Sequence, residues 1–322
     1  MSFYANRRAL VIGGFGFLGI NVTERLRRLG AQVTIVTRSR AAHPAAAATA
    51  GAEGMRVLEG DLRDRPAMDA AVAEQDLVFN LSGQSGAVQS MEDPWTDLDV
   101  NCRGNLVLLE ALRQGNPGAK LIFVSSRLAY GRVGAAPVSE EHLPDPLCVH
   151  AIHKLAVEQY LRLYGQVYGI AWSAARLTNP YGPGQSPQRT AYGIVNRMIH
   201  QALAGNSLRV YGDGLQRRDY VYVDDAVTAL LRMAESPASN GRIYNVGSGV
   251  GTPLVDMARS IGALAGGARI EYVAWPALAE QIETGDFVAD VSRIRRELGW
   301  EPRVALADGL QRTIAFYRSH AA

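Results

Sequence analysis

The sequence predicts an α/β protein with a doubly wound parallel sheet, followed by a smaller mixed α/β lobe. Two observations lead to this prediction. Short apolar runs alternate with segments of helical spacing up to Leu177, as they do where crossover helices join parallel strands. After Arg176 the chain becomes rich in Gly, Pro and polar residues and the predicted elements become shorter, which is typical of loops and a change of lobe.

The N-terminal segment predicts a strand, a glycine-rich turn, a helix and a second strand. The apolar run Ala9–Ile12 stops at glycines, as a buried strand often does. The segment Phe17–Gly30 places apolar residues such as Val22 and Leu26 at helical spacing and ends at a glycine. The second strand is predicted at Gln32–Arg38.

The alternation of strands and helices continues along the chain. The predicted strands are residues 55–61, 76–83, 120–126 and 170–177, and the predicted helices are residues 66–74, 96–114 and 150–169. Their order indicates a parallel sheet that helices cover on both faces. The Ala-rich segment 41–54 is predicted to be a surface loop with a helical turn. We expect one unit over residues 1–178, joined by segments near 220–246, and a second over residues 179–322.

Composition and charge argue against several classes of protein. Of the 322 residues, 48% are hydrophobic and 20% are charged, as in ordinary globular proteins. The net charge is +2 and no basic run is interleaved with aromatic residues, so we expect no nucleic-acid binding. Cys102 and Cys148 are predicted to be reduced thiols, and no metal site is expected. No apolar run suits a signal peptide or a membrane span, so we expect a soluble, cytoplasmic protein.

A glycine pattern between the first strand and the first helix predicts a dinucleotide site. Gly13, Gly16 and Gly19 follow a strand and open a helix, the context that gives this weak motif its meaning. Glycine lets the backbone approach a pyrophosphate, and the helix N-terminus offers free N–H groups and the positive end of a dipole. The expected cofactor contacts in this part of the chain are Gly13, Phe15, Gly16, Phe17, Leu18, Gly19, Arg38, Asp61, Leu62, Leu81, Ser82 and Gly83.

The end of the second predicted strand bears on the choice between NAD and NADP. Thr37 and Arg38 stand where an acidic residue would bind the ribose 2′-hydroxyl of NAD. A guanidinium suits a 2′-phosphate instead, so the prediction leans towards NADP. The alternative is that Arg38 is a solvated charge that stacks on the adenine, and NAD stays open as the cofactor.

Ordered motifs run along nearly the whole chain: GGFGFLG, DVNCRGNLVLLEA, VSSRLAYG, the lysine of VHAIHK, RLTNPYGPGQ, VYGDGLQRRDYVYVDDA, YNVGSG and ELGWEP. With these motifs the chain resembles the extended short-chain dehydrogenase/reductase family, of the NAD(P)-dependent nucleotide-sugar epimerase/dehydratase type. The resemblance implies a Rossmann-type domain that binds the nicotinamide cofactor, and a nucleotide-diphosphate sugar bound between that domain and the C-terminal lobe. It also implies a homodimer formed through the helices predicted at residues 96–114 and 150–169.

The resemblance further implies roles for residues near the cofactor. Ser126 matches the catalytic Ser/Thr that hydrogen-bonds the reacting hydroxyl. Lys154 matches the lysine that binds the nicotinamide ribose, and Asn101 matches a structural and proton-relay asparagine, so both join the expected cofactor contacts.

On the substrate side, the resemblance places Asn179 near the diphosphate and matches Arg218 to an arginine that clamps it. The planar guanidinium suits this role because it meets phosphate oxygens with two hydrogen bonds. The alternative is that Arg218 forms an ion pair with Asp219. The expected substrate contacts are Gln84, Arg127, Asn179, Arg189, Tyr211 and Arg218.

The sequence departs from the family pattern at three places. Arg127 and Leu128 replace the Asp-Glu pair with which 4,6-dehydratases eliminate water, so this reaction is disfavoured. Glu283 stands where the family frequently has another phosphate-binding arginine, so either the binding of the diphosphate or the substrate itself differs from the family pattern. Finally, His150 occupies the position of the active-site tyrosine.

The substitution at His150 changes the charge of the acid–base group. His150 and Lys154 are four residues apart on a predicted helix and share a face, whereas His153 points elsewhere. Neutral imidazole is available as a base at pH 7, but it becomes a cation beside Lys154 when it takes a proton. Two like charges about 4 Å apart cost on the order of 4 kcal/mol at an effective dielectric constant near 20, so we expect Lys154 to lower the pKa of His150.

Three functions are compatible with the predicted catalytic set of Ser126, His150 and Lys154. The first is an NAD(P)-dependent nucleotide-sugar epimerase, most simply one that acts at C4 of an NDP-hexose through a transient keto-sugar. The second is an NADPH-dependent reductase of a keto-sugar nucleotide, in which protonated His150 donates the proton. The third is a non-catalytic protein that binds the cofactor and the nucleotide sugar.

Overall fold

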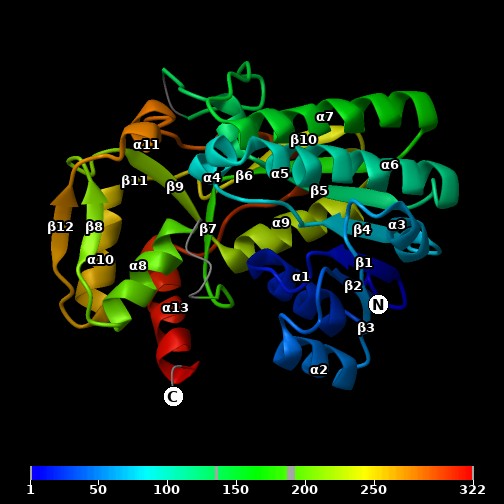
Figure 1. Cartoon of the computed structure of the whole chain (residues 1–322), viewed down its shortest axis with the longest axis horizontal. Helices are drawn as coiled ribbons and strands as arrows, with labels where there is room; N and C mark the ends of the chain where they lie inside the picture. Colours follow the sequence, from blue (N-terminus) through cyan, green and yellow to red (C-terminus); the bar gives the residue numbers. More distant parts are fainter. Residues whose placement is uncertain (1, 135–136, 187–192, 321–322) are drawn as a thin grey trace.

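The computed structural model describes residues 2–134, 137–186 and 193–320. A seven-stranded parallel sheet, in the order β10-β6-β5-β4-β1-β2-β3, forms its centre (Figure 1). Its strands are β1 (Arg8–Ile12), β2 (Gln32–Thr37), β3 (Arg56–Glu59), β4 (Leu77–Asn80), β5 (Lys120–Ser126), β6 (Trp172–Leu177) and β10 (Arg242–Val246). The predicted doubly wound parallel sheet is therefore confirmed.

The order of the strands reverses between β4 and β1. The chain leaves β1 towards β2 on one side, while β4 lies on the other side of β1. Ile12 and Asn80, the last residues of β1 and β4, are partners in register. The segments that follow these two strands therefore meet at one edge of the sheet, which is where ligands bind in sheets of this kind.

Helices cover both faces of the sheet, and each face has its own hydrophobic cluster. α1 (Phe17–Arg28) and α9 (Val223–Glu235) pack on one face. α3 (Arg65–Val72), α6 (Gly104–Gly115) and α7 (Val149–Tyr168) pack on the other (Figure 1). The buried strands therefore bring apolar side chains to both faces, as the apolar runs in the sequence require.

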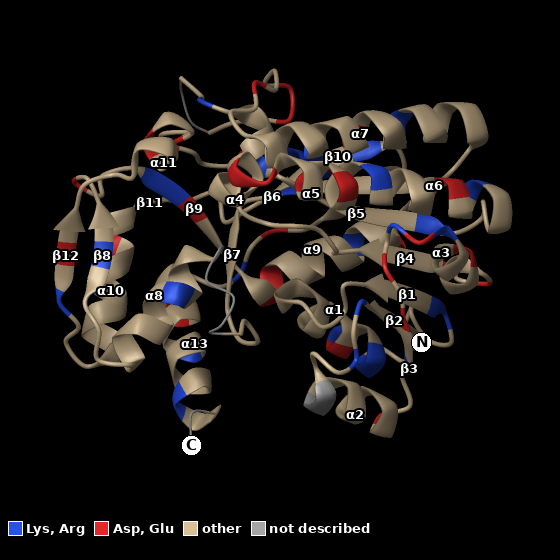
Figure 2. Cartoon of the chain, viewed as in Figure 1, with Lys and Arg blue, Asp and Glu red and all other residues tan. Residues whose placement is uncertain are grey.

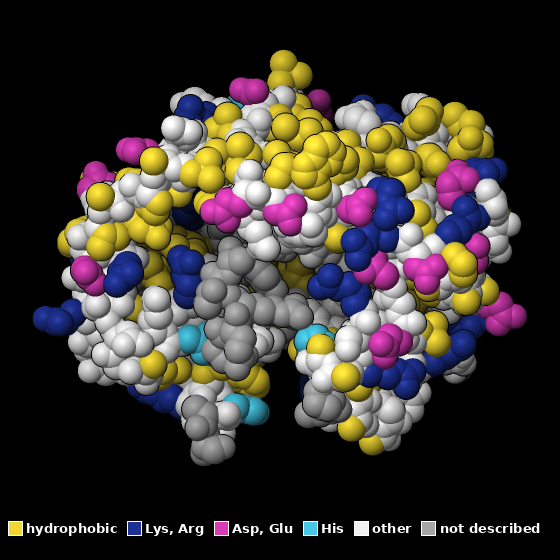
Figure 3. All heavy atoms as spheres, viewed as in Figure 1, with side chains coloured by type: hydrophobic (Ala, Val, Ile, Leu, Met, Phe, Trp, Pro, Cys, Tyr) yellow, Lys and Arg dark blue, Asp and Glu magenta, His cyan; other side chains and the backbone are white. Residues whose placement is uncertain are grey.

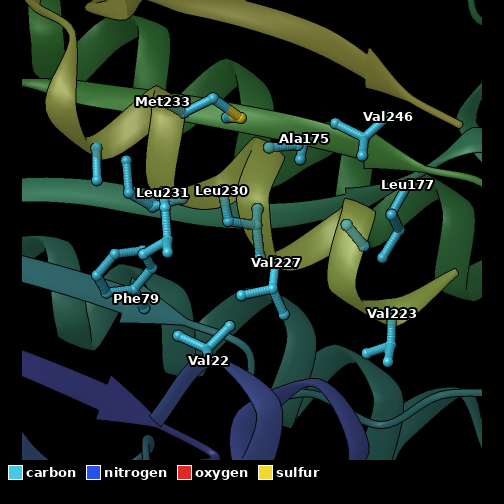
Figure 4. Close-up of a cluster of buried hydrophobic side chains, with 14 of the residues drawn as sticks. Val22, Phe79, Ala175, Leu177, Val223, Val227, Leu230, Leu231, Met233 and Val246 are labelled. Carbon is cyan, nitrogen blue, oxygen red and sulfur yellow. The ribbon is translucent and has the colours of Figure 1, made fainter. Parts of the chain in front are cut away.

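The packing of α9 shows how one of these faces is filled. Along β4, Phe79 belongs to the cluster under α9 and its neighbour Val78 belongs to the opposite cluster. Figure 4 shows Leu230 and Leu231 of α9 above Phe79, with Val227 to its right and Val22 of α1 below. Phe79 is fully buried, so its replacement by Ala would destabilise the fold by about 3–5 kcal/mol.

Two predicted segments differ from the structure. The Ala-rich segment forms α2 (Pro44–Ala52), a nine-residue helix rather than a loop with one turn, because alanine favours helix and Pro44 occupies its first turn. The predicted helix over residues 96–114 is divided into α5 (Pro94–Asp97), a π-helical segment (Leu98–Arg103) and α6. α4 (Ala87–Glu92) precedes them.

The C-terminal lobe is a mixed α/β arrangement around a third hydrophobic cluster, on the left in Figure 1. β7, β9 and β11 form one small sheet, and β8 pairs with β12 in another. The elements are β7 (Asn179–Tyr181), α8 (Ile194–Leu203), β8 (Leu208–Tyr211), β9 (Arg217–Tyr222), β11 (Gly251–Pro253), α10 (Leu254–Ala265), β12 (Ile270–Val273), α11 (Ala277–Gln281) and α13 (Leu306–His320), with α12 (Ser292–Leu298) packed near β10. No helix in the described ranges is long and apolar enough to cross a membrane.

Candidate active site

The glycine turn after β1 forms a cradle made of backbone. Gly13 has φ +82°, and a Cβ atom there would lie 3.1 Å from the backbone of Ser82. A Cβ atom on Gly19 would lie only 2.1 Å from the carbonyl oxygen of Gly13. Gly16 precedes the first residue of α1, and no side chain caps the helix there. The close approach and the free helix N-terminus fit a dinucleotide pyrophosphate, as predicted for this turn.

The apolar residues of the turn contribute differently from the glycines. The side chains of Phe15 and Phe17 are buried in the hydrophobic cluster, and Leu18 packs against it. These side chains therefore anchor the turn in the hydrophobic core. Only the backbone N–H groups of these residues remain available to a phosphate.

The walls on either side of this turn contain the other predicted cofactor residues. Arg38 is exposed directly after β2. Asp61 accepts two hydrogen bonds of 2.8 Å from the guanidinium of Arg63, which holds the pKa of the carboxyl below its usual range. Leu62 is buried, which suits contact with an adenine ring.

On the opposite wall, the segment after β4 is held by buried asparagines. The Ser82 hydroxyl donates to the side chain of Asn80 at 2.7 Å, and Asn80 donates to Asn105 of α6 at 2.7 Å. Leu81 and Gly83 lie on either side of Ser82, so the same network fixes all three residues at the switch point of the sheet.

His150 and Lys154 lie one turn apart near the start of α7, and both are buried. The Lys154 ammonium donates to the carbonyl oxygen of Val124 at 2.9 Å and lies 4.7 Å from the ring centre of Phe123. Burial lowers the pKa of Lys154 to about 8. A Cβ atom on Gly83 would lie 3.5 Å from Nζ of Lys154, so the lysine stands beside the predicted cofactor wall.

Asp97, which the sequence analysis did not single out, contacts both histidines of this helix. Its carboxylate is fully buried, with Oδ1 2.7 Å from Nδ1 of His153 and Oδ2 3.5 Å from Nδ1 of His150. Although burial acts to raise it, the neighbouring side chains of His150, Asn101 and His153 hold the pKa of Asp97 below its usual value. Of its two oxygens, Oδ2 has no hydrogen-bond partner among the described residues. An ionised carboxylate thus lies between two imidazole rings.

Asn101 completes this group from the π-helical segment. Its Nδ2 donates to the carbonyl oxygen of Gln84 at 2.8 Å and lies 3.3 Å from Nδ1 of His150, while its Oδ1 is buried without a hydrogen-bond partner. The spacing of Asp97 and Asn101, four residues apart where a helix was predicted, is the signal that could have identified Asp97.

The pKa of His150 is lowered, as predicted, but Lys154 is not its main cause. Burial has the largest effect, because it disfavours the charged imidazolium. The neighbouring carboxylate of Asp97 acts in the opposite direction and raises this pKa, and the charge of Lys154 adds a smaller decrease. Among the described residues, no group of three or more His, Cys, Asp or Glu side chains suits a metal ion.

Ser126 ends β5, where its Oγ accepts a hydrogen bond of 3.1 Å from the N–H of Leu128. The neighbouring Ser125 points to a different partner and donates to the buried carboxylate of Glu158 at 2.5 Å. Ser126 is half-buried, so of the two serines it is the one that a substrate can reach.

The predicted diphosphate clamp, Arg218, is engaged by the protein itself. It forms an ion pair with Glu283 and donates to the carbonyl oxygen of Gly285. The alternative partner, Asp219, is not used, because its carboxylate accepts hydrogen bonds from Ser248 and from backbone N–H groups. Both residues lie at the start of β9, where basic residues precede an acidic one (Figure 2). Arg218 therefore has to exchange or share its carboxylate partner to bind a diphosphate.

The other predicted substrate residues are dispersed. Nδ2 of Asn179 donates to a backbone carbonyl of β9 at 2.8 Å, and Nε2 of Gln84 is buried without a partner. Tyr211 lies on β8 of the smaller sheet, with its ring 5.2 Å from that of Trp275. Arg127 is buried beside Arg218, and Arg189 lies outside the described residues. Figure 3 shows the molecule hollowed between the part that carries α2 and the part that carries α13.

Comparison with known proteins agrees with this arrangement. The sequence model of the NAD dependent epimerase/dehydratase family matches residues 9–247. A UDP-glucose 4-epimerase of Mycolicibacterium smegmatis is 32% identical, over 97% of this chain and 99% of its own. The crystal structure of the UDP-glucose 4-epimerase of Thermotoga maritima with UDP-glucose has a TM-score of 0.87 and 29% identity, over 98% of this chain and 100% of its own. The Thermus thermophilus UDP-glucose 4-epimerase with NAD has a TM-score of 0.85 and 31% identity, over 97% and 99%.

Proposed function

The chain belongs to the NAD-dependent epimerase/dehydratase family, and on this premise we propose that it is a nucleotide-sugar epimerase that acts at C4 of a UDP-hexose. The observation that carries the proposal is the buried group of His150, Lys154 and Asp97 beside the glycine cradle. The activities of its relatives support the choice of substrate. In this proposal the cofactor lies against residues 1–178, and the sugar nucleotide lies between this unit and residues 179–322.

In this proposal His150 is the group that takes the proton of the sugar hydroxyl. Nδ1 of His150 faces Oδ2 of Asp97 at 3.5 Å and Nδ2 of Asn101 at 3.3 Å, so we assign the role of the base to the other ring nitrogen, Nε2. A nicotinamide cofactor held by the glycine turn, the segment after β4 and Lys154 would supply reversible hydride transfer at the carbon that bears this hydroxyl. His150 then gives its proton back to the oxygen, and Ser126 orients that oxygen throughout.

Asp97 makes a histidine workable at this position. Protonated His150 is repelled by Lys154 and attracted by Asp97. At the 3.5 Å separation of Nδ1 and Oδ2, the attraction is about 5 kcal/mol at an effective dielectric constant near 20, similar to the repulsion expected from a lysine about 4 Å away. The carboxylate therefore offsets the cost of placing two cations side by side, and it acts as a positioning residue through His150.

The lowered pKa of His150 separates this proposal from the reductase alternative. A reductase needs His150 protonated before reaction, which a lowered pKa makes less common at pH 7, whereas an epimerase begins with the neutral base.

For the cofactor we propose NAD. The family description and the NAD-bound relative support it, and the lean towards NADP has no support beyond Arg38 itself.

The experiment that tests the function follows the conversion of UDP-galactose and UDP-glucose by NMR with catalytic amounts of NAD. Interconversion without net change in NADH absorbance supports the epimerase. Stoichiometric consumption of NADPH with a keto-sugar would support the reductase, and binding without turnover across a sugar-nucleotide panel would support the non-catalytic alternative.

For the assembly we propose a homodimer through α5 and α7. Large apolar side chains are exposed there, with Trp95 at 77%, Val167 at 60% and Leu163 at 52% of full exposure. Figure 3 shows hydrophobic side chains gathered over this upper part of the molecule. Such a patch is typical of a protein–protein contact. Sedimentation of the purified protein tests whether the homodimer forms. The cytoplasmic location stays a prediction.

A further inference from the structure

Arg127 is a buried guanidinium without a carboxylate partner. It is the residue after Ser126, in a short 3₁₀ turn (Arg127–Tyr130), and only 7% of it is exposed. It donates one hydrogen bond, of 2.8 Å, to the hydroxyl of Thr284, and its guanidinium carbon lies 5.3 Å from the ring centre of Phe287. Within the described part of the chain, no carboxylate lies at ion-pair distance from it and its remaining N–H groups have no acceptor.

The charged groups around Arg127 are committed elsewhere. Arg218 repels it, while Glu283 and Asp219 attract it from a distance. Glu283 is the ion-pair partner of Arg218, and Asp219 is held by Ser248 and backbone N–H groups. Burial, followed by the charge of Arg218, lowers the pKa of Arg127 to about 10. A buried cation of this kind is costly unless an anion meets it.

A second buried group in the same place also lacks a partner. The side chain of Tyr220 is buried, and its hydroxyl has no hydrogen-bond partner. The charges of both Arg218 and Arg127 act on this hydroxyl, so it belongs to the same cluster. Arg127, Tyr220 and Thr284 together offer a guanidinium and two hydroxyl groups, which is a donor set for an anion.

We propose that Arg127, Tyr220 and Thr284 bind the carboxylate of a uronic acid, so that the substrate is a nucleotide-diphosphate uronic acid. This inference rests on the proposed function and makes it more specific. Arg127 directly follows Ser126, so the anion it binds belongs to the reacting sugar. A carboxylate matches the guanidinium of Arg127, which has no carboxylate partner among the described residues, in charge and in planar geometry. The diphosphate is already assigned to Arg218, which is paired with Glu283, so Arg127 is left to bind a second anion of the substrate.

Calorimetry with the NAD-loaded protein tests this site through binding alone. The probes are UDP, UDP-glucose and UDP-glucuronate, and the variants are Arg127→Met and, as a control for net charge, Arg162→Met on the exposed face of α7. In the unaltered protein and in Arg162→Met we expect UDP-glucuronate to bind at least tenfold more tightly than UDP-glucose. In Arg127→Met this ratio should fall below twofold, with the affinity for UDP unchanged.

Two results would overturn the inference. Equal affinities for UDP-glucuronate and UDP-glucose in the unaltered protein contradict a carboxylate site. An equal loss for UDP and for both sugars in Arg127→Met assigns the guanidinium to the diphosphate instead. If Arg127→Met does not fold, Tyr220→Phe serves as the second variant, because it removes only the hydroxyl. It should weaken the binding of UDP-glucuronate about threefold or more and leave the binding of UDP-glucose unchanged. Equal effects on the binding of both sugars again refute the site.

Turnover separates this inference from the proposed function. If UDP-glucuronate binds selectively but neither UDP-glucose nor UDP-glucuronate is epimerised, the carboxylate site stands and the epimerase proposal fails. If UDP-glucose and UDP-glucuronate are epimerised with equal kcat/KM and equal sensitivity to Arg127→Met, the epimerase proposal stands and the carboxylate site fails.

Discussion

Replacing Asp97 with Asn removes the charge that supports His150 while it keeps the size of the side chain. The carboxylate oxygen lies 3.5 Å from Nδ1 of His150, which corresponds to about 5 kcal/mol of attraction at an effective dielectric constant near 20. An amide oxygen retains part of this interaction. If about half is lost in the transition state, kcat falls roughly 100-fold, since about 1.4 kcal/mol is a factor of ten.

The same substitution should change the pH dependence in a defined direction. Asp97 raises the pKa of His150 against the larger effect of burial, so its loss lowers that pKa further. Because the reaction needs neutral His150, the acidic limb of kcat should move to lower pH in Asp97→Asn. A merely structural role for Asp97 would reduce the amount of folded protein without moving this limb.

The assay is a pH series of sugar-nucleotide interconversion followed by NMR, with circular dichroism to confirm folding. Asp93→Asn is the matched control, because Asp93 is exposed, caps the same short helix through the N–H of Thr96, and Asn caps equally well. Asp93→Asn should keep its activity. If Asp97→Asn retains more than half of the unaltered kcat with the same acidic limb, the support of His150 by Asp97 is refuted.

Three further predictions concern Lys154, the glycine turn and the choice between NAD and NADP. Lys154→Met should raise the pKa of His150, measured by NMR titration of the imidazole, because a neighbouring cation is removed; an unchanged or lower value contradicts the coupling. Gly19→Ala should weaken NAD binding, measured by calorimetry, at least tenfold, since its Cβ atom would lie 2.1 Å from a backbone oxygen. The control Gly51→Ala, whose Cβ atom would have nothing within 4 Å, should bind NAD normally. Normal NAD binding by both variants would refute the role of the glycine turn. The unaltered protein should bind NAD more tightly than NADP, and Arg38→Ala should change that ratio less than threefold; tighter NADP binding that disappears in this variant would reverse the choice of cofactor.

The parts of the fold that were predictable from sequence depend on local patterns. A strand that ends at glycines and is followed by an apolar helix face defines the turn at Gly13 with little help from the rest of the chain. The alternation of strands and helices then predicts the sheet, because crossover connections allow few other arrangements. The Ala-rich helix α2 was missed because it has no apolar periodicity, although its intrinsic helix propensity is high.

The parts of the site that were not predictable depend on contacts between distant segments. The ion pair of Arg218 with Glu283 joins residues 65 positions apart, and no spacing rule predicts which of two nearby carboxylates an arginine selects. The contact of Asp97 with His150 depends on how α5 and the π-helical segment lie against α7. The sequence therefore identified His150 as unusual, but it could not identify the carboxylate that makes the substitution workable.

The most direct test of the central claim is the single-turnover rate of His150→Phe, measured with saturating NAD and UDP-sugar. We expect a loss of at least about 100-fold in this rate, with UDP affinity within twofold of the unaltered protein and an unchanged circular dichroism spectrum. A His150→Phe protein that interconverts the sugars at the original rate would show that another group performs the proton transfer and that His150 is not the acid–base group.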